Sequence, residues 1–161
     1  MQWVDKGRDN GEKLTTVSGD GRISQWAIKK GLDCQDIMRL KRVSRGTKYG
    51  DMKGFAFISQ TSGGMCIDFD PNDPNMYLVG TEDGIIHKCS TSYSEQELET
   101  YYGHNGPVYR VRYNPFHSEI FVSCSSDWTV RVWNHEKETP LLTFESYSVR
   151  AKKVKKKCKK Q

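Results

Sequence analysis

The 161-residue sequence lacks several features that define large classes of protein. No apolar run approaches the ~20 residues that a membrane-spanning helix needs. Residues 1–13 are too polar and charged for a signal peptide. No GxGxxG or Walker motif is present for binding a nucleotide. We therefore expect a cytoplasmic chain with no membrane contact, no cofactor and no enzymatic activity.

The cysteines show none of the spacings that bind a metal ion or build a disulfide framework. Five cysteines are present, at positions 34, 66, 89, 124 and 158, without a CxxC or Cys/His ligand spacing. Cys66, Cys89 and Cys124 lie in apolar, strand-like runs. This pattern predicts small buried side chains in a reducing compartment, and no metal site.

The net charge of +5 comes from the C-terminal tail. Residues 150–161 hold eight of the 25 basic residues and no acidic one, which leaves 17 basic against 20 acidic residues elsewhere. The tail has no aromatic side chain on which a base could stack, so we expect no specific nucleic-acid binding. A disordered terminus is the main prediction for the tail. Contact with an acidic surface, such as a microtubule or nucleic acid, and a nuclear localisation signal are the alternatives.

What the sequence does contain is an internal repeat. Three segments share small residues, an acidic turn and then alternating apolar and polar residues: VSGDGRISQW, VGTEDGIIHKC and SCSSDWTVRVW. In each, an aspartate (Asp20, Asp83 or Asp127) lies six residues before a final large or apolar side chain. Asp83 and Asp127 are 44 residues apart, and a WD-repeat blade takes ~40–45. The repeat therefore predicts an all-β, WD-repeat β-propeller.

The repeat covers only part of a propeller. Asp20 and Asp83 are 63 residues apart, and the excess falls in a stretch rich in Gly, Ser, Thr and Lys that we interpret as an insertion. The predicted units are a truncated blade at 1–43, an inserted loop at 44–64, blades at 65–103 and 104–146, and the tail at 147–161. We thus expect about two full four-stranded blades and one truncated blade. Such an open piece is expected to be marginally stable or prone to aggregate on its own.

Strands follow from alternation and from β-branched residues. They are predicted at 1–4, 13–17, 22–28, 34–40, 65–69, 76–79, 85–88, 98–102, 108–113, 119–124, 129–133 and 141–144. A further short strand is a candidate at 55–58 in the insertion.

The last blade carries a candidate hydrogen-bond network. Gly103-His104 precedes it and Trp133-Asn134 closes it, which matches the GH…WD signature except that asparagine replaces the final aspartate. The predicted network joins four residues, with Asp127 and Ser123 accepting from the two ring nitrogens and the Trp133 N–H donating into it. The four residues are His104, Ser123, Asp127 and Trp133.

The same residue types could form a Ser-His-Asp hydrolase site, which is a weaker hypothesis. No oxyanion-hole or nucleophile-elbow sequence accompanies Ser123. The remaining histidines, at 87, 117 and 135, share no ligand spacing and are interpreted as surface or strand residues.

A narrower resemblance rests on the stretch from Met76 to Glu136. Its runs VGTEDGIIHKCSTSY and NPFHSEIFVSCSSDWTVRVW resemble the propeller of axonemal dynein intermediate chains. The run SGDGRISQWAIKKGLDCQDIMRLKR is most similar to the inner-arm member of that family. The resemblance covers roughly residues 1–146.

This resemblance implies a non-catalytic scaffold subunit of a ciliary or flagellar motor, located on the axoneme as part of the cytoskeleton. The implied partners are the dynein heavy chain and a second dynein intermediate chain. Light chains are expected to bind only through an N-terminal region that we expect to be missing here. The alternative is a generic WD-repeat interaction module of another cytoplasmic or nuclear complex. The loops at 45–64 and 90–97 are candidate contact surfaces.

Overall fold

The computed structural model describes residues 1–5, 11–28, 31–42 and 61–145. Within these ranges it contains twelve β-strands and no helix, and hence none that could cross a membrane. The strands are β1 (Gln2–Asp5), β2 (Glu12–Val17), β3 (Arg22–Ala27), β4 (Asp33–Arg39), β5 (Gly64–Phe69), β6 (Met76–Thr81), β7 (Ile85–Ser90), β8 (Glu99–Tyr102), β9 (Val108–Tyr113), β10 (Ile120–Ser125), β11 (Thr129–Asn134) and β12 (Leu142–Glu145). The all-β prediction is confirmed, and every strand overlaps a predicted one.

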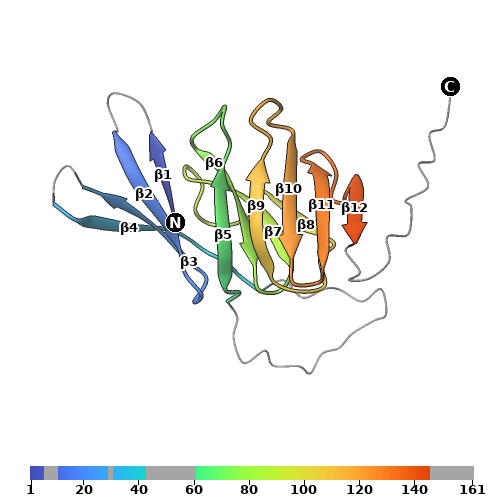
Figure 1. The fold of residues 1–161 in the computed structure, drawn as a ribbon. Coiled ribbons are helices and arrows are strands. Elements are labelled where there is room, and N and C mark those ends of the chain that lie inside the picture. The colour runs from blue at the N-terminus through green and yellow to red at the C-terminus, as the bar shows by residue number, and fades with distance from the viewer. Residues whose placement is uncertain (6–10, 29–30, 43–60, 146–161) are drawn as a thin grey trace.

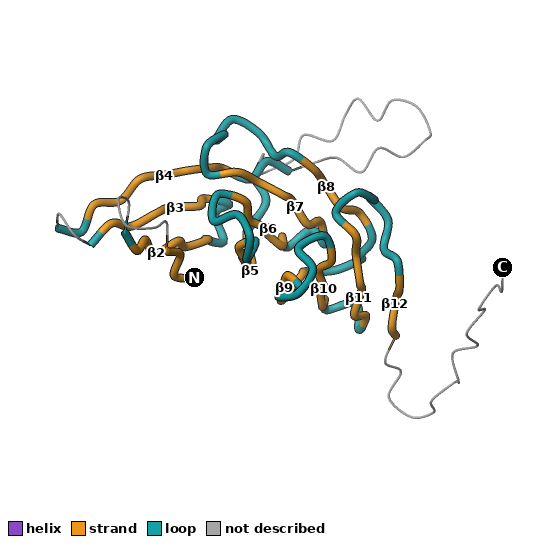
Figure 2. Tube along the Cα trace, turned by 90° about the horizontal axis from the view of Figure 1, so that it is seen from above, coloured by secondary structure: helices purple, strands orange, loops and turns teal. Residues whose placement is uncertain are grey.

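The strands form three antiparallel sheets of four strands each. The first sheet is β1–β4, the second β5–β8 and the third β9–β12, with each strand bonded to its neighbour in sequence. The sheets stand side by side from the N-terminal to the C-terminal end (Figure 1). Seen from above they fan out, with β5 and β9 on the inner side and β4 and β8 on the outer side (Figure 2). This radial arrangement of four-stranded sheets is that of a partial β-propeller.

The turn between the second and third strand of each sheet is built on an aspartate and a left-handed residue. That residue is Gly21 in the first sheet (φ 81°) and Gly84 in the second (φ 80°). In the third sheet the same place is taken by Trp128, whose φ is 63°. A residue with a Cβ is strained in this region, so Trp128 stores backbone strain that the two glycines avoid.

Replacing Trp128 with glycine is therefore expected to raise the free energy of unfolding by about 0.5–1 kcal/mol, because relief of strain exceeds the added entropy of the unfolded chain. Its side chain is 79% exposed, so little packing is lost. Urea denaturation measures the change. The matched control is Gly84→Ala, which is expected to destabilise because the new Cβ would lie 2.6 Å from the His104 carbonyl oxygen. A less stable W128G variant would show that the indole makes a stabilising contact.

Two apolar layers fill the spaces between the sheets. The layer between the first and second sheets is formed by Val4, Ile23, Ile37, Met38, Leu40, Ile67, Phe69, Tyr77, Val79 and Cys89. The layer between the second and third sheets is formed by Leu78, Ile86, Tyr101, Val108, Val111, Tyr113, Phe121 and Trp133. Because successive side chains of a strand point to opposite faces, neighbouring residues such as Leu78 and Val79 pack into different layers.

The cysteines agree only in part with the prediction of buried side chains. Cys89 is buried, while Cys66 and Cys124 are half-buried. Burial raises the pKa of Cys66 to about 11, which keeps its thiol protonated at neutral pH. Cys34 is exposed, because it lies on a part of β4 that no other sheet covers in the described residues. The predictions for residues 43–60 and for the tail at 146–161 lie outside the described residues.

Candidate functional site: a buried histidine network

The network predicted around His104 is assembled from the connection between β8 and β9 and from two strands of the third sheet. His104 follows Gly103 in that connection, and its side chain is fully buried. Ser123 lies on β10 and Asp127 in the turn that follows it. Trp133 lies on β11, and the pairing of Phe121 with Trp133 sets Ser123 diagonally across from the indole. The structure thus brings all four predicted residues together.

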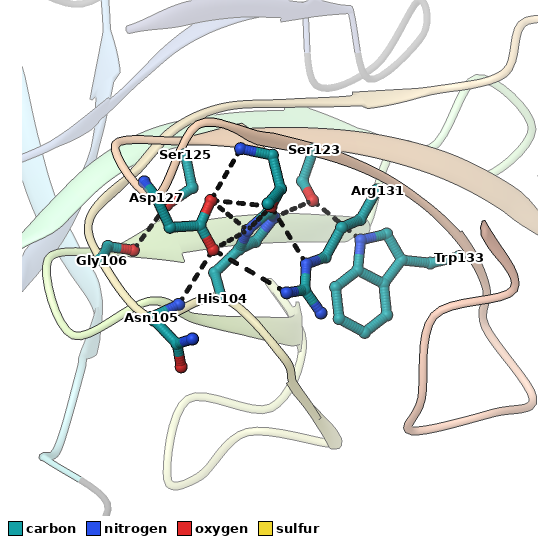
Figure 3. A network of polar contacts seen from close by, with 9 residues as sticks. His104, Asn105, Gly106, Ser123, Ser125, Asp127, Arg131 and Trp133 are labelled. Atoms are coloured by element: carbon teal, nitrogen blue, oxygen red, sulfur yellow. Dashed lines mark hydrogen bonds and ion pairs between the residues drawn. The ribbon is translucent and has the colours of Figure 1, made fainter. Parts of the chain in front are cut away.

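The distances define a continuous chain of hydrogen bonds (Figure 3). His104 Nδ1 lies 3.0 Å from Asp127 Oδ2, and His104 Nε2 lies 2.6 Å from Ser123 Oγ. The Trp133 Nε1–H donates to the same Ser123 oxygen at 2.8 Å. Every polar group of this buried set therefore has a partner, as a stable interior requires.

Electrostatics decide which atom carries each proton. Burial lowers the pKa of His104, and this outweighs the opposing effect of Asp127, so the imidazole is neutral at pH 7. A carboxylate only accepts hydrogen bonds, so Nδ1 carries the hydrogen and Nε2 accepts one from Ser123. The sequence analysis expected Ser123 to accept from the ring, whereas a neutral imidazole with its hydrogen on Nδ1 requires Ser123 to donate to Nε2. A doubly donating ring would be charged, and burial disfavours the charged form.

Asp127 is the hub of the network. Burial alone raises the pKa of its carboxyl, but hydrogen bonds from Thr129, the Asn105 N–H and His104 together lower the pKa below its ordinary value. The Thr129 hydroxyl donates to Oδ1 at 2.7 Å, and the Asn105 N–H donates to Oδ2 at 3.0 Å. Arg131 adds a longer ion pair at 3.9 Å. The carboxylate thus ties the connection after β8 to the turn and to β11.

Three further residues contact Asp127 that the sequence did not predict: Thr129, Asn105 and Arg131. Thr129, Arg131 and Trp133 alternate along β11 and share one face of it, so they reach the network together. The signal available for Thr129 was a hydroxyl residue two positions after a turn aspartate. Asn105 takes part through its backbone N–H, which no residue type reveals.

The other two turn aspartates have different partners. Asp83 accepts from the Ser62 hydroxyl at 2.5 Å and from Arg42 Nε at 3.2 Å. Ser62 and Arg42 lie in the connection between β4 and β5. In the second sheet they therefore contact the turn aspartate as His104 does in the third sheet. Asp20 is exposed and accepts from the Arg22 N–H at 3.1 Å. The shared six-residue spacing predicted the turn correctly, but only Asp127 receives an imidazole among the described residues.

The order Asp127–His104–Ser123 is that of a hydrolytic triad, but its surroundings do not suit that chemistry. Ser123 is only 1% exposed, and its oxygen already receives the Trp133 N–H. A nucleophile has to reach a substrate carbonyl beside an oxyanion hole, and a serine hydroxyl buried between two packed sheets does not have that access. In the described part of the chain, no group of His, Cys, Asp and Glu side chains is placed to hold a metal ion.

The buried histidines give stability a defined pH dependence. Burial lowers the pKa of His104 and also of His87, which lies 3.2 Å from the Thr100 hydroxyl. In the unfolded chain both titrate near ~6.5, so below that pH the unfolded state binds more protons than the folded state. The free energy of unfolding is expected to be level above pH ~6.5 and to fall as the pH decreases below it.

Urea midpoints at about pH 7.5 and about pH 5.5 measure this effect. His104→Gln is expected to reduce the difference between the two midpoints. His117→Gln is the matched control, because His117 is exposed in the turn between β9 and β10. Stability that rises on acidification would contradict the prediction.

Comparison with known protein families matches the part of the chain that contains this network to a repeat family. The WD domain, G-beta repeat family matches residues 95–134, which span β8 to β11 and include the whole network. Residues 95–134 are therefore a WD repeat, within three sheets that have the fold of a partial β-propeller.

Sequence comparison with individual proteins identifies more specific relatives. The chain is 52% identical to dynein axonemal intermediate chain 4 of Mus musculus over 89% of its own length and 19% of that protein. It is 49% identical to the chain of the same name from Xenopus laevis, over 89% of this chain and 21% of that protein. Dynein axonemal intermediate chain 1 of Bos taurus is 40% identical over 90% of this chain and 20% of that protein. The predicted resemblance to axonemal dynein intermediate chains is confirmed, and the chain spans about a fifth of the length of these relatives.

Proposed function

We propose that this chain is a non-catalytic scaffold of an axonemal dynein motor. Its proposed partners are the dynein heavy chain and a second intermediate chain, on the axoneme of a cilium or flagellum. The observation that carries the proposal is the 52% identity to an axonemal intermediate chain across three sheets. We also propose the inner-arm member of the family, on the resemblance carried by the sequence of residues 18–42.

The structure supports a scaffold role through its rigidity. Short turns join the second and third strands of each sheet, and two apolar layers and a buried network hold the sheets together. A rigid frame of this kind presents its loops to partners at fixed positions. The described loop between β7 and β8, residues 91–98, presents a partly exposed Tyr93.

The experiment is expression of the tagged chain in ciliated cells, followed by salt extraction of isolated axonemes. The tagged chain is expected in the extract and is expected to co-purify with dynein heavy chain. Tyr93→Ala is expected to weaken co-purification several-fold, as loss of an exposed aromatic anchor does at interfaces. The matched control is Tyr109→Ala, because Tyr109 is also exposed but lies on β9. Purification of the chain from axonemes without any heavy chain would contradict the proposal.

The second candidate is a WD-repeat interaction module of a different complex, positioned by its basic tail. It is favoured by the eight basic residues at 150–161. Deletion of residues 150–161 separates the two candidates. Loss of all axonemal localisation on deletion would favour the tail, whereas unchanged localisation is expected if the sheets carry the contact.

A further inference from the structure

The turn between β9 and β10 carries a phenylalanine that the fold itself does not require. Phe116 is 88% exposed, and its N–H donates to Asn114 Oδ1 at 2.9 Å, which fixes the turn. The second sheet builds the same turn 44 residues earlier, where the Asn72 N–H donates to Asp70 Oδ1 at 2.8 Å. The turn therefore forms equally well without an aromatic ring.

The exposure of this turn position does not depend on what covers the outer face of the third sheet. The third sheet packs on the second through an apolar layer, yet Asn72 stays exposed beside it. A neighbouring sheet thus leaves the tip of this turn open to solvent. An aromatic side chain held in the open by a turn of fixed geometry is suited to anchor a protein interface.

A cleft of about 530 Å³ lies near this turn, between the second and third sheets. It is lined by residues 96–102, which include β8, and by His135, Glu136 and Glu138 of the turn between β11 and β12. The His135 N–H donates to the Glu119 carbonyl oxygen at 2.8 Å, which joins this turn to the turn of Phe116. Both turns lie at the same end of the third sheet (Figure 1).

The fold holds both walls of the cleft in place. The Tyr101 hydroxyl lies 3.1 Å from the His135 carbonyl oxygen and also contacts the Glu99 carboxylate, so it ties β8 to the turn after β11. Leu98 and Tyr102 line the same cleft and are 44% and 38% exposed. The cleft therefore has a fixed shape and offers apolar surface along one wall.

The charge around the cleft and the turn of Phe116 is strongly negative. Residues 91–102, 114–119 and 135–141 together hold six glutamates and one lysine, Lys137. Lys88 lies 3.5 Å from Glu99 and offsets part of this charge. Such a surface attracts a cationic segment. A lysine or arginine side chain can lay its apolar stem along the wall of the cleft while its charged end meets the glutamates.

We propose that Phe116 and the cleft together bind an extended segment of a partner protein in which lysine or arginine residues flank an apolar side chain. The apolar side chain packs on Phe116, and a cationic side chain enters the cleft. The site is built from turns and strands of two sheets that pack on each other. This proposal does not rest on the proposed role in dynein.

Fluorescence anisotropy of a labelled synthetic peptide, with lysines on both sides of a single leucine, tests the aromatic anchor on the full 161-residue chain. Phe116→Ala is expected to raise the dissociation constant of the peptide about tenfold, as loss of an aromatic anchor does at interfaces. Asn72→Ala is the matched control, because Asn72 takes the same turn position in the second sheet, and it is expected to leave binding unchanged. Equal urea midpoints check that both variants are folded.

A second pair of variants tests the charge. Glu97 lines the cleft, whereas Glu95 is exposed in the same loop and does not line it. Glu97→Gln is expected to raise the dissociation constant about threefold, the usual effect of losing a partly screened ion pair, and Glu95→Gln to leave it unchanged. A peptide with alanine in place of the leucine is expected to bind more weakly and to be insensitive to Phe116→Ala, because the two changes remove the same contact.

Three results would overturn the proposal. No binding of the leucine peptide at any concentration would show that the cleft does not accept such a segment. Equal binding by the unmodified chain and the Phe116→Ala variant would show that charge alone attracts the peptide. Binding that is seen only after deletion of residues 150–161 would assign the cleft to the basic tail of this chain in place of a partner.

Discussion

Replacing Trp133 with alanine is expected to lower the free energy of unfolding by about 3–5 kcal/mol, the usual cost of truncating a fully buried aromatic side chain. The indole is 0% exposed and lies between the second and third sheets. It stacks on Phe121 with ring centroids 5.9 Å apart, and it forms a T-shaped pair with Tyr101 at a centroid separation of 6.0 Å. Removal of the ring leaves a cavity and also deprives Ser123 of a hydrogen-bond donor.

Urea denaturation of the variants measures this loss. Trp128→Ala is the matched control, because Trp128 lies in the preceding turn and is largely exposed, and a change below about 0.5 kcal/mol is expected. Trp133→Phe keeps an aromatic ring in the apolar layer but removes the N–H together with part of the volume of the indole. We expect it to cost about 1–2 kcal/mol. Equal stability of the alanine variant and the unmodified chain would show that the second and third sheets do not pack in this way.

Replacing Asp127 with alanine is expected to lower the free energy of unfolding by about 2–3 kcal/mol, because buried donors lose their acceptor. The carboxylate accepts from His104 Nδ1, from the Asn105 N–H and from the Thr129 hydroxyl. Asn105 is exposed, but His104 is fully buried and Thr129 is buried once the second and third sheets have packed, so these two donors cannot turn to water instead. The loss in free energy of unfolding therefore arises more from the donors that are left without an acceptor than from removal of the carboxylate itself.

Asp20→Ala is the matched control for Asp127→Ala. Asp20 occupies the same turn position in the first sheet but is exposed, and its loss is expected to cost less than about 0.5 kcal/mol. A double-mutant cycle between Asp127 and His104 is expected to give a coupling energy of about 1–2 kcal/mol. His104→Ala alone is expected to lower the free energy of unfolding by about 1–3 kcal/mol. No loss of hydrolytic activity is expected from this variant. Similar losses for Asp20→Ala and Asp127→Ala would show that the imidazole contact adds nothing.

The predicted strands agree well with the structure, because they depend on local chemistry. Alternation in VYRVRY (108–113) and β-branched residues in TVRVW (129–133) specify the strands directly. The turn glycines at 21 and 84 follow from the need for a positive φ after the turn aspartate. Trp128 shows the limit of the rule, since the turn forms there without a glycine. The neighbouring packing tolerates the strain because the Trp128 side chain points into solvent.

The partners of each side chain were predictable only where a known motif names them. The GH…WD signature identified His104, Ser123, Asp127 and Trp133, and the structure places them within hydrogen-bonding distance of one another. Nothing in the sequence assigned Ser62 and Arg42 to Asp83, because these contacts span 21 and 41 residues. Nor did it show that burial keeps His104 neutral and makes Ser123 the donor to it.

The sequence by itself determined that this chain is a series of four-stranded blades and that it resembles an axonemal dynein intermediate chain. Both follow from short-range patterns: strand alternation, turn residues and motifs a few residues long. The tertiary structure decided which of the three equivalent aspartates receives an imidazole and which sheet faces are buried or left open. Those outcomes depend on which sheet lies against which, and packing between sheets brings together residues that are far apart in the chain.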